Sequence, residues 1–179
     1  MITTADTALV LIDVQGILVR IMHDKEALLE NLKKMLKGAL ILELPILWTE
    51  QNPARLGRTL KQIAELLPGK KPVSKLDFSC CGSEQFMQEL KAVNRQHILI
   101  TGVEAHVCVY QTAADLVNLN YDVQVVADAV SSRTLENKQI GLEKIKAAGA
   151  GVTSTEIALF ELLKIAEGDK FKEIMKIIK

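Results

Sequence analysis

The chain has 179 residues, and its 22 basic side chains are balanced by 22 acidic ones, so the formal net charge is zero. A neutral chain has no long-range field to recruit nucleic acid or an anionic membrane surface, and no apolar stretch approaches the ~20 residues that cross a bilayer. Nearly half of the residues are apolar, and a chain of this length and composition predicts a single domain, residues 1–179, with a substantial core. The N-terminus lacks the layout of a signal peptide, and three cysteines give no disulfide framework, so we expect a cytoplasmic protein.

Apolar runs of strand length alternate with helical patterns along the whole chain. Strands are expected at residues 7–13, 46–50, 72–75, 97–101, 122–127 and 152–154. Helices are expected at residues 24–43, 59–67, 83–94, 108–120 and 135–148, from residue 155 onward, and over the tail 170–179. The continuous apolar run in residues 7–13 is typical of a parallel strand that is covered on both faces. The sequence therefore predicts a three-layer α/β/α fold with a doubly wound, mostly parallel, six-stranded sheet of the Rossmann-like type.

Three reactive residues stand at the ends of expected strands, namely Asp13, Lys75 and Cys108. Ligands of an open parallel sheet bind outside the carboxyl ends of the strands, where the winding direction reverses. If the first and fourth strands are neighbours, Asp13 and Cys108 flank that crevice and Lys75 reaches in from farther out. A carboxylate can take the proton of a thiol, and an ammonium group stabilises both anions. Taken singly, these residues also fit a turn former, a surface charge and a buried apolar side chain.

The position of Cys108 at the start of a helix favours its thiolate, because a helix N-terminus presents unpaired N–H groups. His106 lies two residues earlier, on a different face of the helix, so a capping or packing role is favoured over a Cys–His pair. Cys80 and Cys81 are adjacent, a spacing at which disulfides are rare. We expect both near the rim of the pocket, with redox sensitivity a minor alternative.

Three polar residues in the expected loops are the best candidates for contacts with a substrate: Gln15, Gln51 and Arg55. Equally, these side chains can satisfy backbone groups of the loops. The pattern alone leaves both interpretations open.

The sequence resembles the isochorismatase-like hydrolase superfamily, also called the cysteine hydrolases. Residues 11–15 (LIDVQ), Lys75 and residues 101–109 (TGVEAHVCV) carry the resemblance, which covers nearly the whole chain. The tail 156–179 and the segment 49–53 (TEQNP) are similar to the isochorismatase domain-containing branch.

This resemblance implies a catalytic triad of Asp13, Lys75 and Cys108. It also implies a cis peptide bond between Val103 and Glu104, and an oxyanion hole formed by the backbone N–H groups of Glu104 and Cys108. Family members commonly assemble, so a homo-oligomer, either a dimer or larger, is expected, and the apolar C-terminal helix is a candidate interface.

Neither a metal nor an organic cofactor is expected. Metal-dependent relatives such as nicotinamidases carry an Asp-x-His pair after the second strand, whereas residues 50–55 read EQNPAR and no histidine stands between His23 and His97. A zinc site needs three or four clustered ligands. No Gly-x-Gly-x-x-Gly motif follows the first strand, which leaves no signal for a dinucleotide.

These features predict a hydrolase of a small molecule, with neither nucleic acid nor membrane as a partner. Cys108 attacks the carbonyl carbon of an amide or carbamoyl group, Asp13 moves the proton, and Lys75 holds both anions in place. Cleavage of the C–N bond leaves a thioester that water clears. The alternatives are a binding or scaffold protein with weak catalysis, and a redox-responsive thiol protein.

Overall fold

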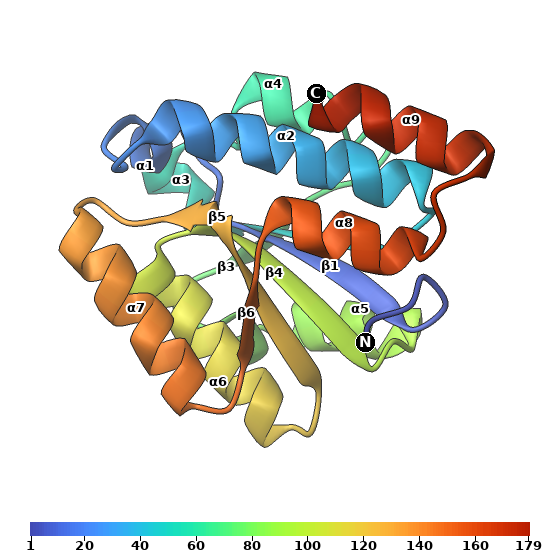
Figure 1. Cartoon of the computed structure of the whole chain (residues 1–179). Helices are drawn as coiled ribbons and strands as arrows, with labels where there is room; N and C mark the ends of the chain where they lie inside the picture. Colours follow the sequence, from blue (N-terminus) through green and yellow to red (C-terminus); the bar gives the residue numbers. More distant parts are fainter.

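The computed structural model describes residues 1–179 and contains a six-stranded sheet with helices on both faces (Figure 1). The strand order is β3-β2-β1-β4-β5-β6, and every pairing is parallel, which confirms the predicted doubly wound α/β fold. The strands are β1 (Thr7–Ile12), β2 (Ile46–Gln51), β3 (Val73–Lys75), β4 (His97–Val103), β5 (Asp122–Ser131) and β6 (Gly151–Thr153).

The helices connect these strands, and none of them is both long and apolar enough to cross a membrane. The α-helices are α1 (Gly16–Arg20), α2 (Lys25–Ile41), α3 (Pro53–Leu56), α4 (Lys61–Ala64), α5 (Glu84–Val93), α6 (Tyr110–Asn118), α7 (Leu135–Ala147), α8 (Thr155–Leu163) and α9 (Gly168–Ile178). The 3-10 helix η1 (Cys80–Gly82) precedes α5, and the π-helix η2 (Ala105–Val109) precedes α6.

Alternate residues of the central strand β1 divide the core into two halves. Leu9 and Leu11 pack with α2, α8 and α9, whereas Ala8, Val10 and Ile12 pack with α5, α6 and α7. The two helical layers lie above and below the sheet in Figure 1. This two-sided burial is the reason that the strand reads as an unbroken apolar run.

The strand order reverses between β1 and β4, which places the switch point of the sheet beside Asp13. Gly102, near the end of β4, has a φ of 112°, and a Cβ there would lie 2.0 Å from the carbonyl oxygen of Ile12. Only glycine permits this approach. The segments that follow β1 and β4, with Asp13 and Cys108, therefore leave the sheet side by side.

Several element boundaries differ from the predicted ones. The strand β5 continues to Ser131 because its pairing with β4 resumes beyond an irregularity, with Gly102 opposite Val130. The helix predicted at residues 59–67 is reduced to α4, one turn between loops. The side chain of Asp24 makes no capping hydrogen bond at the start of α2, where its φ is 47°, whereas the Ser83 hydroxyl caps α5 by accepting from the N–H of Phe86.

Candidate active site

The side chains of Asp13 and Lys75 form an ion pair in the interior of the protein. Lys75 Nζ lies 2.7 Å from Asp13 Oδ2, and both side chains are 0% exposed. The hydroxyl of Thr49 donates to the other carboxylate oxygen, Oδ1, over 2.8 Å. Lys75 comes from β3, two strands away from β1, and its four-carbon stem spans the distance as the sequence predicts.

The ammonium group of Lys75 is saturated by protein oxygens. Besides Asp13, its Nζ atom has Gln51 Oε1 at 2.7 Å, the carbonyl oxygen of Asp77 at 3.2 Å and that of Phe78 at 3.1 Å. An ammonium group has three protons, so no donor remains for another ligand. The Lys75 ammonium group is therefore better suited to act as a fixed positive charge than to transfer a proton.

Neighbouring charges keep Lys75 protonated despite its burial. Burial lowers the pKa of Lys75, but the charge of Asp13, together with Cys80 and Cys108, outweighs it and raises the pKa above the usual 10.5. Lys75 therefore keeps its positive charge throughout the physiological pH range.

Cys108 lies within η2, with 6% of its surface exposed, where its thiol interacts with Asp13. Burial, followed by the negative charge of Asp13, raises the pKa of Cys108 to about 12. The charge of Lys75 opposes this shift but does not reverse it. The N–H groups at the start of a helix would lower the pKa of this thiol and favour the thiolate. In the structure, burial and the Asp13 carboxylate raise the pKa by more than the few N–H groups of η2 lower it. The resting group is a thiol, which ionises only when its proton is taken by a base.

Alkylation measures this protonation state. Since the pKa of Cys108 is raised to about 12, and burial also raises the pKa of Cys80 to about 12 and of Cys81 to about 11, iodoacetamide at pH 8 should modify the native protein more slowly than the urea-unfolded chain. The native rate should climb as the pH rises toward 10. Peptide mass spectrometry of timed samples reports each cysteine separately, and rapid modification of Cys108 at pH 6 would contradict this assignment.

The peptide bond between Val103 and Glu104 is cis. The Glu104 side chain pairs with Arg133, which lies between β5 and α7: its Oε2 accepts hydrogen bonds from the backbone N–H and the Nε–H of Arg133 at 3.0 and 3.1 Å. His106 also makes a structural contact, 2.9 Å from Nδ1 to the hydroxyl of Ser132, in keeping with a packing role.

The three candidate substrate contacts differ in their surroundings. Gln15 is fully buried, and its amide donates to the carbonyl oxygens of Gln51 and Gly57 while its Oε1 accepts from the N–H of Gln51. The Gln51 amide bridges Lys75 and the carbonyl oxygen of Leu76. Both side chains are thus occupied by the protein, whereas Arg55 is exposed on α3 and makes no side-chain hydrogen bond or ion pair.

Thr49 is the site residue that the sequence reasoning missed. It accepts a weak hydrogen bond from the Cys80 thiol, 3.8 Å away, in addition to its donation to Asp13. The pairing of Ile12 with Thr49 places this hydroxyl beside Asp13. An alignment of the residues of the first two strands, β1 and β2, would have indicated that Thr49 lies beside Asp13. Cys80 itself is buried behind Thr49, not on a rim.

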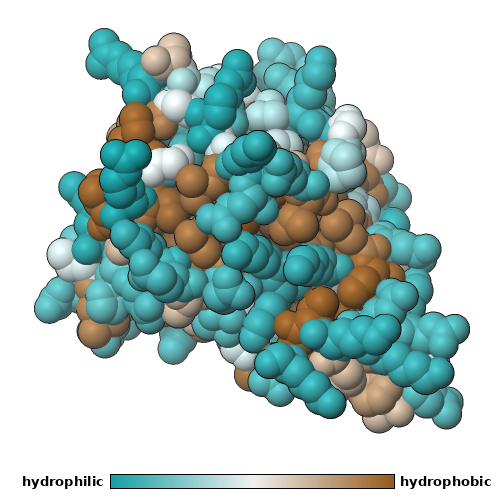
Figure 2. All heavy atoms as spheres, turned by 90° about the horizontal axis from the view of Figure 1, so that it is seen from above, coloured by the Kyte–Doolittle hydropathy of each residue, from teal (hydrophilic) through white to brown (hydrophobic).

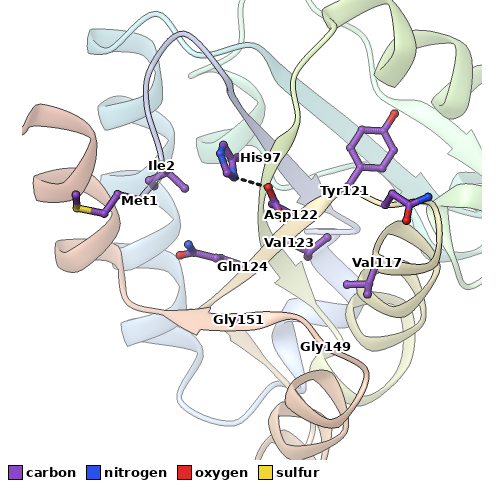
Figure 3. A pocket seen from close by; sticks show the side chains of 11 residues that line it. Met1, Ile2, His97, Val117, Tyr121, Asp122, Val123, Gln124, Gly149 and Gly151 are labelled. Carbon is purple, nitrogen blue, oxygen red and sulfur yellow. Dashed lines mark ion pairs between the residues drawn. The ribbon is translucent and has the colours of Figure 1, made fainter.

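The largest pocket, about 640 Å³, lies away from these residues, at the amino ends of the strands. Figure 3 shows His97, Asp122 and Gly151, the first residues of β4, β5 and β6, around it. No group of three or more His, Cys, Asp or Glu side chains is placed to hold a metal ion, and the absence of a metal from the working protein remains a prediction.

Residues 7–157, which contain Asp13, Lys75 and Cys108, match the family model described as the isochorismatase domain. The chain belongs to the isochorismatase family. It is a hydrolase of that family, which confirms the resemblance predicted from the sequence. Several relatives carry the name isochorismatase domain-containing protein, the branch suggested by the tail.

One relative in this family is the secreted isochorismatase effector Isc1 of Phytophthora sojae, 37% identical over 171 residues that cover 93% of this chain and 81% of the effector. A structure described as the MAR1 ribonuclease of Caenorhabditis elegans is 32% identical, with a TM-score of 0.92, and the match covers 99% of this chain and 91% of that one. The Escherichia coli YcaC gene product, described as an octameric hydrolase of unknown specificity, shares the fold at 20% identity, with a TM-score of 0.94 and coverage of 99% and 88%.

Proposed function

We propose that this protein hydrolyses a C–N bond of a small amide or carbamoyl compound, with Cys108 as the nucleophile. The observation that carries the proposal is the buried Asp13–Lys75 ion pair beside the Cys108 thiol. Burying two charges costs several kcal/mol per ion, so a site that keeps them next to a nucleophile has a use for them. Asp13, Lys75 and Cys108 form the proposed catalytic triad.

In the first half of the reaction, Asp13 takes the thiol proton as the sulfur attacks the carbonyl carbon. The developing oxyanion is held by the backbone N–H groups of Glu104 and Cys108, the proposed oxyanion hole. The C–N bond then breaks, and the leaving nitrogen takes the proton from Asp13, which leaves an acyl thioester on Cys108.

In the second half, water attacks the thioester and Asp13 takes one of its protons. The C–S bond breaks, the acid is released, and Asp13 returns the proton to the sulfur. Lys75 exchanges no proton in either half. Its charge stabilises the thiolate that forms when Asp13 is neutral. Because protein oxygens already hold the ammonium group in place, this electrostatic stabilisation is preorganised.

A panel of small amides, ureas and carbamates, assayed with the native protein and the Cys108→Ala variant, tests this function. Turnover that the substitution abolishes supports the hydrolase. Ligand binding without turnover supports the binding or scaffold alternative, and a stable sulfenic acid or disulfide at Cys108 after mild peroxide supports the redox alternative. Single-stranded RNA belongs in the panel because one structural neighbour is described as a ribonuclease. Cleavage of RNA but of no amide would overturn the proposal.

The Gln51 and Arg55 side chains should have different kinetic effects. Gln51→Leu removes an acceptor from Lys75, so we expect kcat to fall about 10-fold or more, the scale of one lost hydrogen bond to a charged group, with KM nearly unchanged. If Arg55 binds the substrate, Arg55→Ala should raise KM and leave kcat unchanged. Steady-state kinetics separates the two effects, and a Gln51→Leu variant altered only in KM would contradict a positioning role.

We further propose that the protein works as a homo-oligomer, as the octameric YcaC neighbour does. We also propose that the substrate is a small molecule, that neither nucleic acid nor a membrane is a partner, and that the protein is cytoplasmic. The formal net charge of zero supports the choice of a small substrate over a polyanion.

A further inference from the structure

The hydroxyl of Thr49 is a buried polar group to which the proposed mechanism gives no part. Thr49 is 0% exposed, and Leu47, two residues earlier on the same face of β2, belongs to the half of the core that packs with α5, α6 and α7. Valine has the same shape as threonine and would fill the same space. Because a buried hydroxyl is unfavourable unless it is hydrogen-bonded, the contacts of this hydroxyl need an explanation.

The hydrogen bonds of the Thr49 hydroxyl run in one direction. The Cys80 thiol donates to Thr49 Oγ1 over 3.8 Å, and Thr49 Oγ1 donates to Asp13 Oδ1 over 2.8 Å. A carboxylate can only accept, so the single hydroxyl proton goes to Asp13. Burial raises the pKa of Cys80 to about 12, and its thiol therefore stays a donor at physiological pH. The Cys80 N–H in turn donates to the hydroxyl of Thr112 in α6 at 2.9 Å, which fixes η1 behind Thr49.

Thr49 holds Asp13 at two places. Its hydroxyl binds Oδ1 of the carboxylate, and its carbonyl oxygen accepts from the Asp13 N–H over 3.3 Å. The other carboxylate oxygen, Oδ2, has Lys75 Nζ at 2.7 Å. With a fixed donor on each oxygen, the carboxylate plane cannot rotate freely about the Cβ–Cγ bond. Asp13 is therefore held in one orientation beside the Cys108 thiol, with which it interacts.

We propose that Thr49 is a positioning residue for Asp13, and that its hydroxyl, backed by the Cys80 thiol, both orients the carboxylate and keeps it ionised. A hydroxyl donates more strongly to a carboxylate than to a neutral carboxyl group, so it favours the form of Asp13 that can take a proton. The inference rests on the proposed hydrolase for its use. It adds two side chains outside the triad to the control of the proton transfer from Cys108.

The Thr49→Val variant tests the role of the hydroxyl, because it keeps the shape of the side chain and the backbone contact with Asp13. Carbon-13 NMR of protein labelled at the aspartate Cγ atoms follows the titration of Asp13 without any substrate, and the Asp13→Asn variant identifies its signal. We expect the midpoint to rise by about one pH unit in Thr49→Val, since a charged acceptor gains more from the hydrogen bond than a neutral one. Thr49→Ser keeps a hydroxyl and should stay within about 0.3 pH unit of the native midpoint.

Thr101→Val is the matched control. Thr101 is also 0% exposed, and its hydroxyl donates to the carbonyl oxygen of Val10 over 3.1 Å. Leu99 and Val103, two residues to either side of it on β4, belong to the opposite half of the core, below the layer of α2 and α9 whose outer surface Figure 2 shows. This substitution removes a buried hydroxyl that does not touch Asp13, so the midpoint of Asp13 should stay at the native value.

Kinetics provides a second readout once a substrate is in hand. Thr49→Val should lower kcat about 10-fold with KM nearly unchanged, and should move the acid limb of the pH–rate profile to higher pH. Cys80→Ala removes only the weak donor behind Thr49, so its effect on the Asp13 midpoint should have the same sign and be smaller.

The outcomes separate this inference from the proposed hydrolysis. An Asp13 midpoint that Thr49→Val leaves unchanged, or that Thr101→Val or Thr49→Ser moves as far, would overturn the positioning role even if the native protein is an active hydrolase. A midpoint that shifts as expected in a protein that cleaves no amide would support the effect of Thr49 on Asp13 and overturn only the hydrolase.

Discussion

Replacing Cys108 with alanine should reduce kcat/KM by about three orders of magnitude or more, with little change in stability. Removal of the nucleophile from a triad eliminates the covalent route, and the activity that remains comes from binding and oxyanion stabilisation. The cavity left by one sulfur atom should cost about 1 kcal/mol of unfolding free energy. Steady-state kinetics on the best substrate of the amide panel, together with urea unfolding, measures the two effects.

The control for this substitution is Cys81→Ala, which removes a half-buried thiol in η1 instead. Its kcat/KM should stay within about 2-fold of the native value, as for most substitutions outside the reacting groups. A Cys108→Ala variant that retains a tenth of the native activity would exclude a thioester route.

Breaking the buried ion pair should have the largest effect on stability. Lys75→Met leaves the Asp13 carboxylate at 0% exposure with the Thr49 hydroxyl and the Cys108 thiol beside it but no counter-ion, and removal of one partner from a buried pair typically costs about 3–5 kcal/mol. Asp13→Asn leaves the Lys75 ammonium without its counter-ion and should cost a similar amount. Both variants should also lose catalysis, since each removes a charge that the proposed mechanism uses.

The double variant Asp13→Asn/Lys75→Met makes this prediction specific. Once neither charge is buried, most of the lost stability should return, because the cost comes from the uncompensated ion. Activity should not return. Urea unfolding of the native protein, the two single variants and the double variant gives the coupling free energy. If the stability losses of the single variants simply add in the double variant, the two side chains are not coupled and the prediction is wrong.

The order of the elements could be predicted because each strand of a doubly covered sheet is a continuous apolar run. Residues 7–12 and 97–101 are such runs, and both are strands of the structure. Tertiary contacts decide the other boundaries. The pairing of β5 with β4 carries it four residues beyond the apolar pattern to Ser131. The short strand β3 is recognisable mainly because Pro72 and Lys75 flank an apolar residue.

The candidate site could be predicted in part, because parallel strands bring their carboxyl ends to one edge of the sheet. That rule places Asp13, Lys75 and Cys108 together, and the structure has Asp13 in contact with the other two. Thr49 was not foreseen, since its contact with Asp13 depends on register. The protonated state of Cys108 was not foreseen either. It depends on burial, which no local pattern gives.

Mass spectrometry of the protein during turnover tests the central proposal most directly. The protein is mixed with an excess of a slow amide or an activated ester, quenched in acid within seconds, and digested. We expect the mass of the acyl group on the peptide that contains Cys108, and its loss on treatment with hydroxylamine, which cleaves thioesters. Steady turnover without any adduct on Cys108, or an adduct on Cys80 or Cys81 instead, would contradict the proposal.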